Sequence, residues 1–122
     1  MGYTTGYRAG VLPLTLRRVY VQGVEGAMAA YFIVDVDVKN ARAYESYKHS
    51  AAASIAQYGG RYLVRGGTHE VLEGAWHPTR LVILEFPSVE AAKRWYASAE
   101  YGAVKPIRLE HAKSDLVLVE GV

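Results

Sequence analysis

Three charged residues lie in short, mainly apolar runs, each of which carries one further charge: Asp35 in AYFIVDVDV, Arg65 in RYLVR and Glu85 in RLVILEF. A carboxylate in an apolar cleft has a raised proton affinity and can act as a general base. An arginine can hold a carboxylate or an enolate-like oxygen through two parallel hydrogen bonds. Asp35, Arg65 and Glu85 are therefore the candidate catalytic residues, and the chemistry they indicate is general acid–base work on a small ligand.

The glycine-rich stretch YGGRYLVRGG, at 58–67, raises a different possibility, which is phosphate binding. A phosphate loop lies between a strand and the N-terminus of a helix, and neither of its usual glycine spacings is present here. The stretch also follows a predicted helix instead of opening one. We therefore expect its glycines to end a helix and then a strand.

The predicted elements that position these residues follow the order β-α-β-β-α-β. Alternating, β-branched runs predict strands at 30–38, 61–65, 80–86 and 115–122, with a short extended piece at 70–74. Apolar residues at three- and four-residue steps predict helices at 41–58 and 89–101, capped by Asn40 and Ser88, and a helical turn is expected after Pro106. This order predicts a ferredoxin-like α+β fold, a four-stranded antiparallel sheet with both helices on one face.

The other face of such a sheet is left open. The alternation along each strand assigns to it the following residues: Tyr31, Ile33, Asp35, Asp37, Arg61, Leu63, Arg65, Leu81, Ile83, Glu85, Leu116, Leu118 and Glu120. This set is too apolar to face water, so we expect a second copy to cover it in a sheet-to-sheet homodimer. Its charges form either a structural ion network or a polar cluster that binds a small molecule between sheet and helices.

Several motifs occur in order along the body of the chain: YGGRYLVRGG at 58–67, LEG at 72–74, LEFPS at 84–88 and SAEY at 98–101. Through them the chain, from about Ala30 to Val122, resembles a bacterial family catalogued as domain of unknown function 1330. The resemblance implies the dimeric α+β barrel superfamily, whose members include cofactor-independent monooxygenases, haem-degrading enzymes, peroxidases and ligand-binding regulators. It carries over no reaction of the family's own.

Recurrent residues of that family fall here on Gly66, Gly67 and Tyr101, as well as on Arg65 and Glu85. Together with Arg108, an acid–base candidate on the predicted turn, Tyr101, Gly66 and Gly67 are the candidate ligand-binding residues. Two functions remain open. One is a small cofactor-independent enzyme, oxygenase- or isomerase-like, with a pocket between sheet and helices; the other is a non-catalytic dimeric ligand-binding or stress-associated module.

Charge and composition argue against several kinds of binding partner, namely nucleic acids, membranes and metal ions. The 122 residues carry a net charge of +2, and this excess lies in residues 1–28; the remainder holds 11 basic and 11 acidic residues. A neutral body argues against nucleic-acid binding, and no apolar run approaches the ~20 residues that span a membrane. The absence of cysteine fits a cytoplasmic protein. HEVLE, at 69–73, is not the H-E-x-x-H zinc motif, so we expect neither a metal nor a cofactor.

The first 28 residues differ from the rest, since they have five glycines and no sustained helical or strand period. We expect residues 1–28 to be a leader or tag-like extension and residues 29–122 to form a single domain.

Overall fold

A computed structural model of the protein describes residues 28–122. Its sheet has the strand order β2-β3-β1-β4, and all neighbouring strands are antiparallel. The four strands are β1 (Ala30–Val38), β2 (Arg61–Arg65), β3 (Leu81–Phe86) and β4 (Ala112–Glu120). The leader predicted at 1–28 falls outside the described residues except for Met28.

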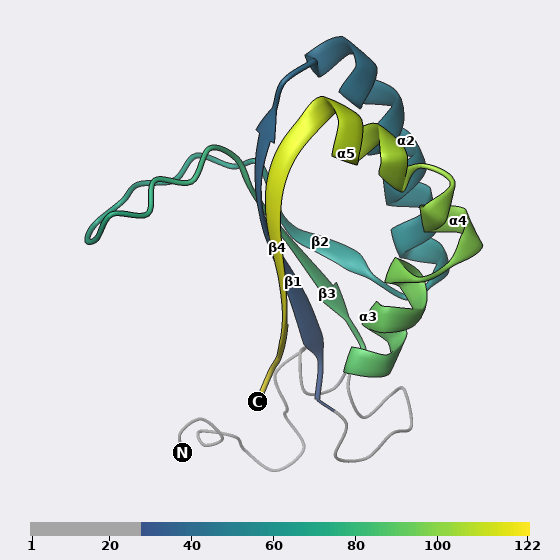
Figure 1. The fold of residues 1–122 in the computed structure, drawn as a ribbon. Coiled ribbons are helices and arrows are strands. Elements are labelled where there is room, and N and C mark those ends of the chain that lie inside the picture. Colours follow the sequence, from purple (N-terminus) through teal and green to yellow (C-terminus); the bar gives the residue numbers. More distant parts are fainter. Residues whose placement is uncertain (1–27) are drawn as a thin grey trace.

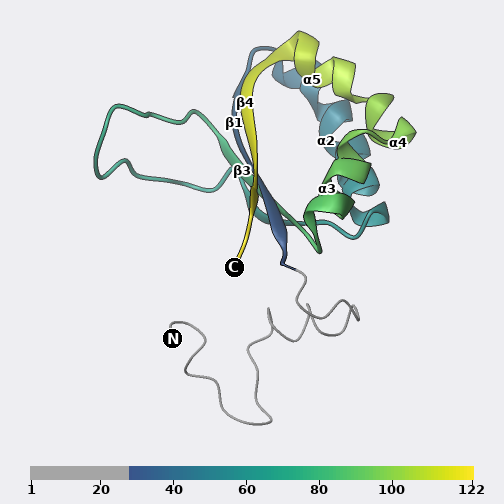
Figure 2. The same ribbon diagram turned by 60° about the horizontal axis from the view of Figure 1, so that its bottom comes forward.

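The helices all lie on one side of this sheet, as Figures 1 and 2 show from two directions. They are α2 (Ala41–Gln57), α3 (Val89–Tyr96), α4 (Ala99–Gly102) and α5 (Lys105–His111). The fold is therefore the ferredoxin-like α+β arrangement that the sequence predicts. The second predicted helix, 89–101, is divided at Ser98, whose hydroxyl accepts a hydrogen bond from the Tyr101 amide and caps α4.

Local chemistry explains where α2 begins and ends. The Asn40 side chain accepts a hydrogen bond from the Ala43 amide at 3.1 Å, which is the capping interaction expected of asparagine. At the other end, Gly59 has φ of 82°, a conformation that costs glycine little, and the Gly60 amide donates to the Ile55 carbonyl at 2.9 Å. This turn delivers the chain directly into β2.

The core lies between the helices and the sheet. Phe32, Phe86, Trp95 and Tyr101 form an aromatic cluster in it, and the Trp95 and Tyr101 rings lie 4.1 Å apart. Trp95 also donates from Nε1 to the Ser54 hydroxyl at 2.9 Å, so the buried indole N–H is satisfied. The tightly packed aromatic cluster fixes α3 and α4 against β1 and β3.

The faces predicted for the first and third strands are confirmed, but those of β4 were predicted the wrong way round. The antiparallel register pairs Leu116 with Val34 and Leu118 with Phe32, so these two leucines pack under the helices. Val117 and Val119 lie on the open face instead, with exposed fractions of 58% and 43%. Both alternate sets of β4 are apolar, so alternation alone could not assign them. The open face nevertheless remains apolar.

The connection between β2 and β3 forms an arm, residues 66–80, that projects away from the sheet on the side opposite the helices (Figures 1 and 2). The extended piece predicted at 70–74 does not pair as a strand. Leu72 and Trp76 are exposed on this arm, at 83% and 59%. Two features of the fold thus expose large apolar side chains: the open sheet face and the arm that projects from it.

Candidate functional site

The sequence predicted Arg65 on the open face of the sheet. In the structure it lies on the face covered by the helices. The register of β2 on β3 shifts by one residue between Tyr62 and Val64, so that Arg65 is opposite the buried Val82. Such a β-bulge reverses the face of every residue that follows it. The Arg65 guanidinium lies 4.2 Å above the Tyr62 ring, and its Nη2 donates to the Lys48 carbonyl of α2 at 3.3 Å.

Glu85 remains on the open face, where it has partners other than Arg65. Its side chain is only 6% exposed and accepts a hydrogen bond from Arg61 Nε at 2.9 Å. The Tyr31 hydroxyl donates to the same carboxylate at 3.2 Å. Glu85 and Arg65 therefore do not pair, because the sheet separates the two side chains.

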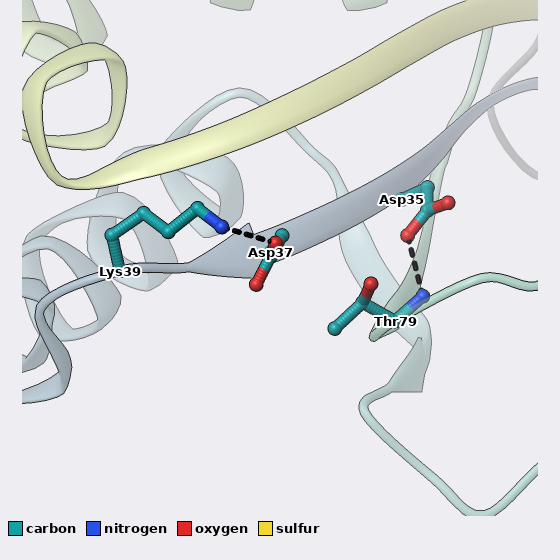
Figure 3. A network of polar contacts seen from close by, with 4 residues as sticks. All are labelled: Asp35, Asp37, Lys39 and Thr79. Carbon is teal, nitrogen blue, oxygen red and sulfur yellow. Dashed lines mark hydrogen bonds and ion pairs between the residues drawn. The ribbon is translucent and has the colours of Figure 1, made fainter.

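Asp35 also lies on the open face, where it holds the arm. Its carboxylate accepts hydrogen bonds from the Thr79 amide at 2.9 Å, drawn in Figure 3, and from Trp76 Nε1 at 3.0 Å. Both bonds lower the pKa of Asp35 below its ordinary value, and the bond from Trp76 has the larger effect. In the pairing of β1 with β3, Glu85 lies opposite Tyr31, four residues before Asp35. Four residues span about 13 Å along a strand, so Asp35 and Glu85 are far apart on the open face. The cluster predicted from Asp35, Arg65 and Glu85 does not form.

A cavity does lie between the sheet and the helices, as the sequence predicted, but its residues differ from those expected. The centre of a water-sized molecule can move within about 40 Å³ of it, and its empty volume is about 450 Å³ when the open solvent at its mouth is counted. Six of the thirteen residues that line it are aliphatic. The charged residues lining it are Lys48, Arg65, Arg80 and Arg108, and the phenols are Tyr44, Tyr47 and Tyr62. A second, more open hollow shares Tyr44, Lys48 and Arg80 with it.

The three arginines of the cavity carry positive charge without a matching carboxylate among residues 28–122, whereas the fourth cation, Lys48, pairs with Glu45 at 3.2 Å. Among residues 28–122, no aspartate or glutamate lines the cavity, and none forms an ion pair with Arg65, Arg80 or Arg108. Arg108 is the most buried of the three, at 5% exposed. A buried cation without a counter-charge is costly, so this arrangement favours an anion in the cavity.

Arg108 is held by neutral hydroxyl groups. Its Nε donates to the Tyr101 hydroxyl at 3.1 Å, and its Nη1 donates to Ser114 Oγ. The Tyr101 hydroxyl in turn lies 2.6 Å from that of Tyr47. Tyr101, a predicted ligand-binding residue, is completely buried and is not among the residues that line the cavity, but it connects two that are, Arg108 and Tyr47.

The two candidate glycines have different surroundings. Gly66 has φ of 74°, and a Cβ there would lie 2.7 Å from Arg80 Nε. Gly66 thus leaves room for Arg80, which comes from the far end of the arm. No atom lies within 4 Å of the position that a Gly67 Cβ would take. Gly66 therefore supports the cavity, whereas Gly67 lies in open space.

The phenols of the cavity act as neutral groups. Burial raises the pKa of Tyr44, Tyr47 and Tyr62 above the ordinary tyrosine value, and the neighbouring Tyr101 adds to this effect at Tyr47. At neutral pH their hydroxyls are therefore protonated and can donate hydrogen bonds. None of the three is suited to remove a proton from a ligand.

The comparisons with known proteins agree with this fold. Residues 29–122 match the family model described as Domain of unknown function (DUF1330). A crystal structure of a protein of unknown function from Rhodopseudomonas palustris has a TM-score of 0.66 at 18% identity, with 92% of this chain and 96% of that chain covered. No curated protein matches the sequence significantly.

Two other solved structures carry functional descriptions. SnoaB from Streptomyces nogalater, described as a cofactor-independent oxygenase, has a TM-score of 0.55 at 15% identity, over 79% of this chain and 95% of that chain. A conserved protein from Bacteroides thetaiotaomicron, described as a possible oxidoreductase, has a TM-score of 0.53 at 19% identity, over 79% and 100%. Likenesses at these identities establish the fold. In the part of the chain that is described, no helix is long and apolar enough to cross a membrane.

Proposed function

The chain belongs to the family described as Domain of unknown function (DUF1330), and we propose that it is a small-molecule-binding protein whose cavity holds a small organic anion. The observation that carries this proposal is the group Arg65, Arg80 and Arg108, which line one cavity with no carboxylate partner among residues 28–122. An anion would offset the cost of burying Arg108. The aliphatic walls would cover the ligand's apolar part.

A thermal-shift series tests this proposal. Acetate and benzoate should raise the melting temperature of the wild-type protein, because a ligand that binds only the folded state stabilises it. Benzamide, which has the shape of benzoate without its charge, should have a smaller effect. If neither carboxylate stabilises the protein more than benzamide does, the anion-binding proposal fails.

Substitution of the cavity arginines locates the effect. Arg65→Gln and Arg80→Gln should each reduce the benzoate shift, because each removes a positive charge from the cavity wall. Arg94→Gln serves as the matched control, since Arg94 is an exposed arginine of α3 that does not line the cavity. Equal shifts in all three variants would place the bound anion elsewhere.

Catalysis is a second candidate function, favoured by one observation. The arginines that would bind a carboxylate could also stabilise an enolate, which is the form of substrate that an oxygenase- or isomerase-like enzyme without a cofactor needs. The likeness in fold to SnoaB is compatible with this candidate. However, neither Asp35 nor Glu85 lies at the cavity, and its phenols are protonated. Ligand binding without catalysis is thus the better-supported function.

The proposal extends to a homodimer through the open sheet face. Val117 and Val119 expose apolar surface there, and the arm projects from the same side (Figure 2). A second copy would cover both, because the two identical faces are self-complementary about a twofold axis. Light scattering should give twice the mass of one chain, and a mass equal to one chain would refute the dimer.

A further inference from the structure

Three residues beside the cavity form a directional chain of hydrogen bonds. Arg108 Nε lies 3.1 Å from the Tyr101 hydroxyl, and that hydroxyl lies 2.6 Å from the Tyr47 hydroxyl. Arginine can only donate, so the Tyr101 oxygen accepts from Arg108. The direction of the second bond, between the two tyrosines, decides what the cavity presents to a ligand.

Burial favours one direction. Tyr101 is 0% exposed, and among residues 28–122 its hydroxyl forms hydrogen bonds with Arg108 Nε, which can only donate, and with the Tyr47 hydroxyl. Leaving the Tyr101 hydroxyl proton unsatisfied would cost about 1–3 kcal/mol. Tyr101 therefore donates to Tyr47. The Tyr47 proton is then directed away from Tyr101, and Tyr47 lines the cavity, where a bound molecule can accept it.

Arg108 presents a second donor to the same space. Its Nε and Nη1 are used by Tyr101 and Ser114, whereas Nη2 has no partner among residues 28–122. Because Arg108 and Tyr47 both line the cavity, it offers two kinds of donor, one charged and one neutral. A carboxylate has two oxygens in one plane and fits such a pair of donors.

We infer that the ligand is a monocarboxylate with an apolar body, and that Tyr47 is the residue that orients its carboxylate, donating to one oxygen while Arg108 Nη2 donates to the other. This inference rests on the proposed function, because it assumes that an anion occupies the cavity. The aliphatic part of the wall favours a ligand with an apolar body over inorganic phosphate, which has no apolar surface to place against it. Tyr47 is thereby a specificity-determining residue.

Calorimetric titration of benzoate into the wild-type protein, Tyr47→Phe and Tyr58→Phe tests the role of Tyr47. Loss of a hydrogen bond to a charged group should weaken binding to Tyr47→Phe by about tenfold or more. Tyr58→Phe is the matched control at the end of the same helix, because the Tyr58 hydroxyl donates to Glu100, outside the cavity. It should bind benzoate as the wild-type protein does.

The outcomes separate this inference from the proposed function. If the wild-type protein binds benzoate and Tyr47→Phe binds it equally well, the role of Tyr47 is refuted while the anion site stands. If the wild-type protein binds neither acetate nor benzoate, the anion site itself is refuted. Tighter binding of inorganic phosphate than of benzoate would overturn the choice of a carboxylate ligand.

A crystal structure of the wild-type protein with benzoate gives a readout that does not depend on how a variant folds. The inferred geometry places one carboxylate oxygen at hydrogen-bond distance, about 2.5–3.0 Å, from Tyr47 Oη. The other oxygen should contact Arg108 Nη2. A carboxylate bound only by Arg65 and Arg80 would contradict the inferred orientation.

Discussion

The Arg80 guanidinium lies directly over Gly66, with Nε 2.7 Å from the position that a Cβ on that glycine would take. Gly66 follows β2 and Arg80 precedes β3, so the two ends of the arm meet here. The Gly66 amide also donates to the Leu81 carbonyl at 2.7 Å, which closes the base of the arm. The base of the arm thus sets the position of one cavity cation.

Gly66→Ala should both destabilise the protein and weaken benzoate binding. A non-glycine residue at φ of 74° costs about 1–2 kcal/mol, and the new methyl group would displace Arg80 from the cavity wall. Gly67→Ala is the matched control, since its added methyl meets open space. Chemical denaturation and benzoate titration measure the two effects. Equal benzoate affinities for the two variants would contradict a role of Gly66 in placing Arg80.

Acid should release the arm from Asp35. The hydrogen bonds from Trp76 and Thr79 lower the pKa of this carboxyl below its ordinary value of 3.8. The stabilisation is therefore fully present above that value and is lost as the pH falls through the lowered pKa. Trp76 fluorescence, taken as the difference between wild type and Trp76→Phe, should change in this range. Asp35→Asn removes the titrating group and should abolish that transition; its persistence there would assign the change to another group.

Val117→Asp should break the proposed homodimer. A carboxylate placed in an apolar interface without a partner is costly, so the dissociation constant should rise by at least about tenfold. Leu109→Asp is the control on the helical side, because Leu109 is similarly exposed, at 63% against 58% for Val117. Analytical ultracentrifugation measures both variants. Dissociation by Leu109→Asp, with Val117→Asp still dimeric, would place the interface on the helices.

The fold could be predicted from the sequence because its signals are local. Alternating residues mark the strands, and Asn40 and Ser88 cap helices as expected, each with a hydrogen bond to the amide three residues on. The faces of β4 could not be predicted in this way, since Leu116 and Val117 are equally apolar. Only the pairing with β1 decides which of them faces the helices.

The candidate site was predicted less well, for three physical reasons. A bulge of one residue after Tyr62 moved Arg65 to the other face, and bulges leave no reliable mark in a single sequence. Arg80 belongs to the cavity but lies at the end of a long arm, far in sequence from the helices it approaches. Tyr47 belongs to the apolar face of the helix predicted at 41–58, but nothing local shows that its hydroxyl meets that of Tyr101.

The most direct test of the anion site is benzoate titration of the wild-type protein beside Arg108→Met, with the thermal stability of each measured without ligand. Methionine fills similar space without charge, so it removes a buried cation that has no carboxylate partner among residues 28–122. The account predicts that Arg108→Met melts no lower than wild type and binds no benzoate. Benzoate affinity equal to that of wild type in the folded variant would contradict the account.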